Sequence, residues 1–495
     1  MQRSSGILMH ISSLPSPYGI GTFGRAAYEF VDFLKRAKQR YWQVLPLGPT
    51  SFGDSPYQSF SAVAGNPYFV DLDQLIEQGL LKSEDVADRD WGNEPGCVNY
   101  GKIFQSRFAV LEHAFDAFRQ NDVRMDALTG YVRQNGDWLE DYALFMALKD
   151  ANGGRPWTEW PEDIRLRKPD AVDRCRMKYA QRMSFYRFIQ YTFSMQFLAL
   201  KTYANEQGVQ IIGDLPIYVP LDSADVWAAP EEFQLDESRR PLAVAGVPPD
   251  YFSADGQLWG NPLYDWGHMR DTGYAWWRRR MQAASELFDV IRIDHFRGLS
   301  SFWRVPVDEI TARNGEWITG PGLHLIDVLK QQFRHLQIIA EDLGFLTDDV
   351  RALVDASGYP GMKVLQFAFD AREPSNYLPH TYPRHCVCYT GTHDNTTAVG
   401  WFSEAAEEDI AVAVRYLGLN AEEGYHWGLI RGGMGSVADL FIAQLQDYLG
   451  LDATARMNTP GTLGGNNWRW RLQPGQLNDA LAARIAQMCR IYGRM

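Results

Sequence analysis

The sequence has little cysteine, and its cysteines form no recognisable pattern. Five are scattered over 495 residues, an odd number, and only Cys386 and Cys388 lie close together. A structural zinc site uses a second ligand pair, which this C-x-C stretch lacks. We expect reduced thiols inside the fold, and neither a disulfide framework nor a bound metal.

Long apolar runs and excess positive charge are also missing. No stretch approaches the roughly 18 consecutive apolar residues that span a bilayer. The formal net charge of −13 opposes binding to nucleic acid or to an anionic membrane surface. The apolar run at the amino terminus is short and is interrupted by His10, which argues against a secretory signal and predicts a cytoplasmic protein.

The chain alternates between apolar strand-like runs and helical patterns, which predicts parallel pairing in an α/β fold. Eight predicted strands match a closed (β/α)8 TIM barrel, and they start near Gly6, Tyr41, Val209, Val290, Leu336, Met362, Cys386 and Ala455. A helix is expected from Ser436 to Leu449, directly before the eighth strand.

At 495 residues the chain is longer than a plain barrel of about 250 residues, so we expect insertions. Residues 72–208 show long helical stretches and no clear strand, which predicts a helical insertion subdomain between strands 2 and 3. Residues 246–264 are rich in Pro and Gly and are expected to form a long active-site loop. We predict that 1–495 is one catalytic barrel without a C-terminal β-sandwich domain.

Three of the predicted strands end in carboxylates. Asp294 follows Val290 to Ile293, Glu341 follows a run ending at Ala340, and His393 and Asp394 follow the run that starts at Cys386. Any one of them is explained equally well by a charge marking where a strand becomes a loop. Three repeats of the pattern favour a function, because a parallel barrel opens to its pocket at the carboxyl ends of its strands.

Paired carboxylates at neighbouring strand ends suit glycosidic chemistry. Retention at the anomeric carbon needs two carboxyl groups about 5 to 5.5 Å apart, one attacking and one protonating the departing oxygen. Asp294 and Glu341 are the candidates. Arg292, two residues before Asp294 on the same strand face, is expected to lower the pKa of the attacking group, and burial is expected to raise that of Glu341. Asp394 and His393 would then hold the sugar.

Sugar rings also need flat apolar faces and polar partners. The chain has 16 Trp, 24 Tyr and 26 Phe, most of which we expect in the core. Those in Pro- and Gly-rich loops are the better candidates for a site, namely Tyr57, Phe252 and Trp259. Loop residues with polar side chains are natural partners for hydroxyls, although each alone is more often a turn former: Asp214, Asp250, Asn261 and Asn458.

Several long, irregular blocks resemble the amylomaltases, bacterial 4-alpha-glucanotransferases that are called disproportionating enzymes in plants. The likeness runs in order over nearly the whole chain. The clearest blocks are Ser12-Ser-Leu-Pro-Ser-Pro-Tyr-Gly-Ile-Gly21, Asp54-Ser-Pro-Tyr-Gln-Ser-Phe-Ser61, Gly246-Val-Pro-Pro-Asp-Tyr-Phe-Ser253, Ile291-Arg-Ile-Asp-His-Phe-Arg-Gly298, Ala340-Glu-Asp-Leu-Gly344 and Tyr389-Thr-Gly-Thr-His-Asp-Asn395.

The resemblance implies a retaining transferase of the α-amylase superfamily, with Asp294 as nucleophile, Glu341 as acid/base and Asp394 as stabiliser of the transition state. It implies transfer between maltooligosaccharides, amylose or glucans derived from starch or glycogen, without a cofactor. It also implies substrate contacts at Ser55, Tyr57, Asp250, Trp259, Arg292, His393 and Asn458.

Two positions depart from the family pattern. Phe52 stands where some relatives have Tyr at a secondary glucan groove, with Tyr100 as its companion, so stacking is kept and a hydroxyl is lost. The stretch from Gly464 to Arg471 is slightly expanded, which leaves the alignment of Asn466 and Asn467 open.

Two other readings remain at this point. Asp, Glu and His at strand ends also suit a metal-dependent barrel hydrolase, although few His lie there. A glucan-binding protein without turnover would keep the aromatic loops, and the intact carboxylates argue against it.

Overall fold

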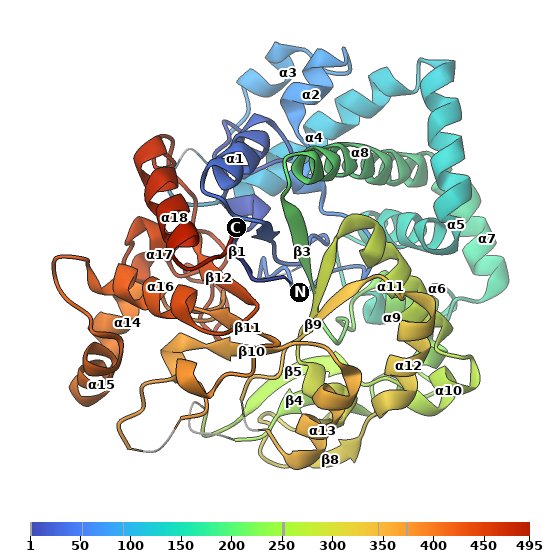
Figure 1. Ribbon diagram of the computed structural model, residues 1–495. Helices are drawn as coiled ribbons and strands as arrows, with labels where there is room; N and C mark the ends of the chain where they lie inside the picture. Colours follow the sequence, from blue (N-terminus) through green and yellow to red (C-terminus); the bar gives the residue numbers. More distant parts are fainter. Residues whose placement is uncertain (1, 52, 93, 250–252, 345, 373–374) are drawn as a thin grey trace.

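The computed structural model describes residues 2–51, 53–92, 94–249, 253–344, 346–372 and 375–495. Eight parallel strands form one sheet in the order β10-β11-β12-β1-β2-β3-β6-β9, curled into a barrel (Figure 1). This confirms the (β/α)8 fold. The barrel strands are β1 (Ser4–Leu8), β2 (Tyr41–Gln43), β3 (Gln210–Leu215), β6 (Val290–Ile293), β9 (Gln337–Ala340), β10 (Gly361–Val364), β11 (Cys386–Tyr389) and β12 (Leu440–Gln444).

The barrel closes between β9 and β10 through few bonds. The Ala340 N–H donates to the Pro360 carbonyl over 3.0 Å, and the Met362 N–H donates to the Asp342 carboxylate over 2.6 Å. A Cβ on Gly361 would lie 2.5 Å from Oδ2 of Asp342, so a side chain there would displace this carboxylate. The Asp342 side chain therefore joins the first and last strands of the sheet.

The eighth strand is not where the sequence placed it. Leu440–Gln444 forms β12, inside the segment predicted as a helix, and the stretch at Ala455 is a short 3-10 turn, Ala453–Ala455, followed by loop. All five residues of β12 are buried. A short apolar run without alternation fits a buried strand and a buried helix equally well, which explains the wrong prediction.

Helices cover the outside of the barrel, and those between β2 and β3 form a large helical insertion, in which the described residues contain no strand (Figure 1). Aromatic contacts hold its long helices together, for example Phe118 against Phe188 at 4.8 Å between ring centroids. The insertion contains α2 (Leu72–Glu77), α3 (Ser83–Ala87), α4 (Tyr100–Phe118), α5 (Asp122–Ala151), α6 (Glu162–Arg165), α7 (Pro169–Lys178) and α8 (Ala180–Glu206).

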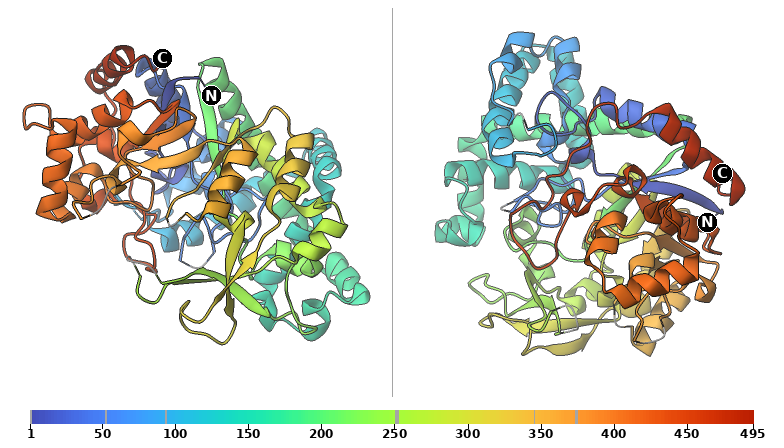
Figure 2. Two further views of the ribbon diagram at one scale, coloured as in Figure 1. Left: turned by 60° about the horizontal axis from the view of Figure 1, so that its bottom comes forward. Right: turned by 90° about the vertical axis from the view of Figure 1, so that its left-hand side faces the viewer.

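The remaining helices follow the barrel strands. They are α1 (Arg25–Arg36), α9 (Ala224–Ala228), α10 (Trp266–Asp271), α11 (Ala275–Leu287), α12 (Gly322–Gln332), α13 (Asp348–Ser357), α14 (Ala398–Glu404), α15 (Glu407–Leu417), α16 (Tyr425–Gly435), α17 (Leu445–Leu449) and α18 (Asp479–Ile491). Helix α18 packs on α1, and the two chain ends lie side by side in both views of Figure 2. After β12 the described residues form helices, turns and loop, and no further strand.

A second, antiparallel sheet lies beside the barrel (Figure 2). Its order is β5-β4-β7-β8, from β4 (Ala243–Val247), β5 (Gln257–Pro262), β7 (Ser301–Pro306) and β8 (Glu316–Thr319). The stretch 246–264, expected as loop, thus contains the end of β4 and all of β5. The strands were not predicted because Gly and Pro are rare inside strands. Gly246 is required here, because a Cβ would come within 2.6 Å of the Gln257 carbonyl.

No helix in the described part of the chain has the length and apolar character required for crossing a membrane. The free cysteines Cys175, Cys386, Cys388 and Cys489 are buried, and Cys97 is partly so. Burial raises the pKa of the Cys388 thiol to about 11.

Candidate active site

Three carboxylates lie at the carboxyl ends of barrel strands. Asp294 directly follows β6, and Glu341 directly follows β9. These strands are neighbours, with Ile293 opposite Ala340 in register, so the two carboxylates stand side by side at one end of the barrel. Asp394 lies in the loop after β11. The Asp294 and Asp394 side chains remain 28% and 45% exposed, which leaves both open to a ligand.

Arg292 lies between two carboxylates. Its Nη1 donates to both oxygens of Asp214 over 2.7 Å and to Oδ1 of Asp294 over 2.9 Å. Asp214 and Arg292 are opposite each other in the pairing of β3 with β6, and both side chains are buried. These bonds hold the Arg292 guanidinium against the Asp294 carboxylate.

The pKa of Asp294 is raised, whereas the sequence predicted that Arg292 would lower it. Burial is the main cause, Arg292 opposes it, and the Asp214 carboxylate adds to the rise. The prediction was wrong in its net direction because burial of the carboxyl outweighs the attraction of Arg292, and the Asp214 carboxylate adds to the rise. The effect of Arg292 itself has the expected sign.

Glu341 is held by two backbone N–H groups. His295 donates to Oε2 over 2.6 Å, and Leu343 donates to Oε1 over 2.9 Å. Burial raises the pKa of Glu341 to about 7, against the lowering effect of Arg292 and of these two bonds, with Asp294 adding to the rise. A carboxyl group that titrates near neutrality is suited to giving and taking a proton.

The turn after β6 brings the backbone N–H of His295 to the Glu341 carboxylate. His295 has a φ of 51° in the left-handed region, which breaks the strand immediately after Asp294. Its ring meets Trp259 of β5 edge-on, with centroids 4.7 Å apart. The antiparallel sheet thus contacts the residue that hydrogen-bonds Glu341.

Asp394 is held by two neighbours. The Asn458 side-chain amide donates to its Oδ1 over 2.6 Å, and Nε2 of His393 lies 3.3 Å from the same oxygen. The Asn458 N–H donates to the His393 carbonyl over 3.1 Å. The loop after the 3-10 turn Ala453–Ala455 therefore fixes the residues after β11.

Tyr57 connects the Asp214–Arg292–Asp294 group with His393 and Asp394. Its hydroxyl donates to Oδ2 of Asp214 over 2.7 Å and lies 3.3 Å from Nδ1 of His393. The Tyr57 and His393 rings stack at 4.9 Å. The single Tyr57 proton goes to Asp214, and the phenolic oxygen is in polar contact with Nδ1 of His393. A continuous polar network then runs from Asp294 to Asp394.

The other predicted contact residues lie beside Tyr57, in β5, or outside the described residues. Ser55 accepts the Tyr57 N–H at its Oγ over 3.2 Å, which shapes the turn that presents Tyr57. Asn261 lies buried in β5. Three residues of the sequence prediction fall outside the described part of the chain: Phe52, Asp250 and Phe252.

Tyr100, the predicted companion of Phe52, begins α4. It is only 7% exposed, and its hydroxyl donates to the Trp468 carbonyl over 2.9 Å. The secondary glucan groove stays a prediction.

Asp214 and Trp468 are the residues that sequence reasoning undervalued. Asp214 sits inside β3 and was considered only as a partner for hydroxyls, since Gly213-Asp-Leu-Pro216 reads as a turn. A buried arginine at Arg292 requires a buried counter-charge, and that requirement was the available signal. The Trp468 ring lies 5.8 Å from the rings of both Tyr57 and His393, and no local pattern marks it.

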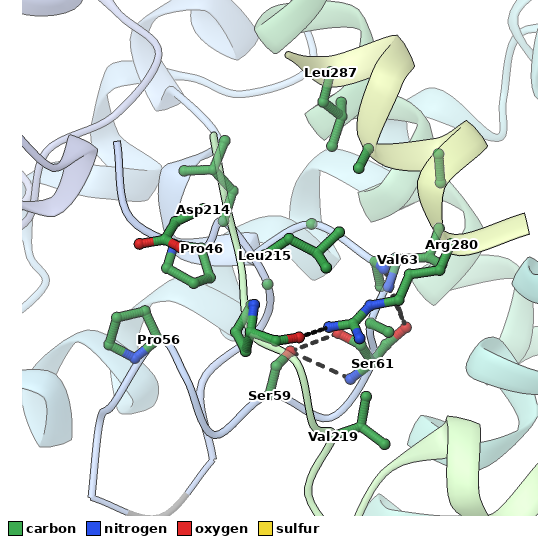
Figure 3. A pocket seen from close by; sticks show the side chains of 18 of the residues that line it. Pro46, Pro56, Ser59, Ser61, Val63, Asp214, Leu215, Val219, Arg280 and Leu287 are labelled. Atoms are coloured by element: carbon green, nitrogen blue, oxygen red, sulfur yellow. Dashed lines mark hydrogen bonds between the residues drawn. The ribbon is translucent and has the colours of Figure 1, made fainter. Parts of the chain in front are cut away.

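A small cavity adjoins the network. It has a volume of about 70 Å³ and is lined by Tyr57, Asp214, Pro46, Pro56 and Arg280, among others. Figure 3 shows the Asp214 carboxylate and the Arg280 guanidinium well apart, with Leu215 between them. Among the described residues no group of three or more His, Cys, Asp or Glu is arranged to hold a metal ion.

Comparison with known proteins gives one family. A family model described as 4-alpha-glucanotransferase matches residues 9–478. A 4-alpha-glucanotransferase of Clostridium butyricum is 48% identical over 98% of this chain and 100% of its own length. That of Thermus thermophilus is 47% identical over 100% of both.

Solved structures agree. An amylomaltase from Streptococcus agalactiae, determined in complex with acarbose, superposes with a TM-score of 0.97 at 42% identity and covers 100% of both chains. The amylomaltase of Corynebacterium glutamicum has a TM-score of 0.80 at 20% identity, covering 98% of this chain and 75% of the other. The second likeness supports the fold alone.

Proposed function

The chain belongs to the 4-alpha-glucanotransferase family, and from that premise we propose that it transfers α-1,4-glucan segments with retention, through a covalent β-glycosyl ester on Asp294. The observation that carries this proposal is the placement of Asp294 and Glu341 directly after neighbouring barrel strands. Two adjacent carboxyl groups in different environments are what a two-step displacement requires.

Asp294 serves as nucleophile in this proposal. Its carboxylate is partly exposed, and Nη1 of Arg292 contacts one of its oxygens. That contact stabilises the ionised form and leaves the second oxygen for the anomeric carbon. Attack forms the C1–O bond to Asp294 while the bond from C1 to the leaving sugar oxygen breaks.

Glu341 serves as acid and then as base. With a pKa of about 7 it holds a proton for the departing 4-oxygen during the first step. The resulting carboxylate then takes the proton from the incoming 4-hydroxyl as that oxygen attacks C1 and displaces Asp294. Each proton given in the first step is recovered in the second, so no cofactor or nucleotide is consumed.

Asp394 stabilises the flattened sugar ring of the transition state in this scheme. Asn458 and His393 fix its orientation, which lets it accept hydroxyl protons without reorganising. Tyr57, Trp259 and Ser55, together with Asp250, are proposed to contact the donor chain. The proposed donors and acceptors are maltooligosaccharides, amylose, and glucans derived from starch or glycogen.

Incubation with maltotriose tests the function. A transferase converts it into glucose and longer maltooligosaccharides with little net gain in reducing ends, because each bond broken is replaced by another. A steady rise in reducing ends would identify a hydrolase instead, and no change in the product ladder would leave only glucan binding. Full activity after exhaustive chelation is expected, and its loss would favour the metal-dependent alternative.

A further inference from the structure

A second, larger cavity lies away from the three carboxylates. It has a volume of about 260 Å³ and is bounded by α5 of the helical insertion, by α9 and the turn after it, and by α11. We call it the α5–α11 cavity. It shares Ser61, Val63 and Arg280 with the small cavity beside Asp214. Its volume is many times the roughly 30 Å³ that one water occupies in the liquid.

One wall of the α5–α11 cavity offers unused acceptors. Glu232 is only 8% exposed, and its Oε2 has no hydrogen-bond partner among the described residues. Burial is the main cause that raises its pKa. A buried carboxylate oxygen without a donor is costly, and a ligand hydroxyl would remove that cost. Asp225 lies on the same side, and its Oδ2 accepts the Ala62 N–H over 2.7 Å.

Two arginines of α11 contribute donors to the lining. Arg280 is buried and has its guanidinium on the carbonyls of Pro216 at 2.5 Å and Ile217 at 3.0 Å. Its Nε has no partner among the described residues. Figure 3 shows Arg280 reaching from its helix toward the segment after Leu215. Arg279, next to it on α11, is half-buried and also lines the cavity.

Tryptophan rings complete the lining. Trp138 on α5 is half-buried, and Trp276 on α11 is buried. Flat aromatic faces suit the C–H face of a sugar ring, while carboxylates and guanidinium groups bind its hydroxyls. A polyanion would meet Asp225 and Glu232, and a simple cation would meet Arg279 and Arg280. The mixture of both charges with aromatic faces fits a neutral polyhydroxylated ligand.

We propose that the α5–α11 cavity is a second carbohydrate site that binds one terminal glucose unit of a maltooligosaccharide, apart from the reacting carboxylates. The ring would lie against Trp138, with Glu232 accepting a hydroxyl proton and Arg279 donating to a ring or hydroxyl oxygen. That the sugar is an α-glucan rests on the proposed function, whereas the preference for a neutral polyol rests on the cavity itself.

Hydrogen–deuterium exchange of the full chain tests this proposal. The Asp294→Asn variant is used so that maltotriose is not consumed. We expect maltotriose to slow exchange in two separate regions, the segments 131–142 and 224–232 around the cavity and the segments 53–59 and 390–395 around the carboxylates. Adding Trp138→Ala or Glu232→Gln should abolish the slowing in the cavity segments and keep it at the carboxylates.

Glu237→Gln is the matched control, because Glu237 is exposed and lies outside the cavity lining. It should leave the slowing in both regions unchanged. Slowing at the carboxylates alone, or cavity slowing that survives both Trp138→Ala and Glu232→Gln, would overturn the second site. Slowing in the cavity alone would support the second site and contradict the proposed function, so the two failures are distinguishable.

Discussion

The backbone N–H of His295 donates to Oε2 of Glu341 over 2.6 Å, so the residue after Asp294 holds the carboxylate of the next strand. The two carboxyl groups that we propose to react are thereby joined through one turn of backbone. Any change that moves this turn is expected to alter the position of Asp294 and the pKa of Glu341 together.

The first prediction separates the two carboxylates by their roles. Asp294→Asn and Glu341→Gln should each lower kcat on maltotriose by roughly three orders of magnitude or more, since each removes a transition-state interaction. With a maltosyl fluoride donor the first step of Glu341→Gln should be largely restored, because fluoride leaves without being protonated. Asp294→Asn should stay inactive with either donor.

Circular dichroism of both variants is the control for folding. Equal rescue of the two variants by the fluoride, or near-normal turnover of either with maltotriose, would be incompatible with the proposed division of roles.

The second prediction concerns pH. In the proposed scheme Glu341 must be protonated for the first step, and its pKa is raised to about 7. The proton is therefore present below pH 7 and is lost above it, so kcat/KM for maltotriose should fall by about tenfold per pH unit on the alkaline side. A pH–rate profile measures this. With maltosyl fluoride the alkaline fall of the first step should disappear, and a fall that persists would assign it to another group.

The third prediction concerns Asp214. Asp214→Asn keeps the shape of the side chain but leaves the buried Arg292 with one carboxylate fewer, which should cost about 3 to 5 kcal/mol in the free energy of unfolding. It also removes a charge that raises the pKa of Asp294. Asp294 should then ionise at lower pH, which moves the acidic limb of the pH–rate profile to lower pH.

Glu316→Gln is the comparison for Asp214→Asn. It removes an exposed carboxylate paired with Arg304 and should change the free energy of unfolding by less than about 1 kcal/mol. An acidic limb of Asp214→Asn at the original pH, or shifted upward, would show that Asp214 does not act on Asp294 as described.

The fourth prediction concerns the barrel closure. In Gly361→Ala the new Cβ would approach Oδ2 of Asp342 to 2.5 Å, so the variant should lose about 1 to 3 kcal/mol of unfolding free energy. Gly130→Ala, in the interior of α5 with nothing within 4 Å of its Cβ, should gain up to about 1 kcal/mol. Denaturant titration of both measures the difference, and an equal effect of the two would remove the special role of Gly361.

The sequence predicted the strands whose own residues show both an apolar run and the polar residues that end it. The runs ending at Ile293 and Ala340 are short, apolar and followed by carboxylates, so both the strands and the site residues after them were predictable. Leu440 to Ala443 are all apolar, so neither the two-residue period of a strand nor the 3.6-residue period of a helix can be recognised there. The sheet containing Trp259 was not predicted, because β4 and β5 contain Gly and Pro and β4 pairs with β7 across residues far apart in the sequence.

The net pKa of Asp294 was beyond local reasoning for a related cause. Arg292 was visible two residues away, but burial of Asp294, which is the main cause of the raised pKa, and the Asp214 carboxylate on another strand were not. Electrostatic effects of this kind depend on which strands are neighbours, and that is decided only by the complete fold.

One of the two hydrogen bonds described at the junction between β9 and β10 is accepted by a titratable side chain, so closure of the barrel depends in part on its ionisation. Met362 donates its N–H to the Asp342 carboxylate, and acid that neutralises this carboxylate weakens its hold. We therefore expect acid to open the barrel first between β9 and β10, next to Glu341. The other neighbouring strands of the barrel, which are paired through more backbone hydrogen bonds, should stay paired.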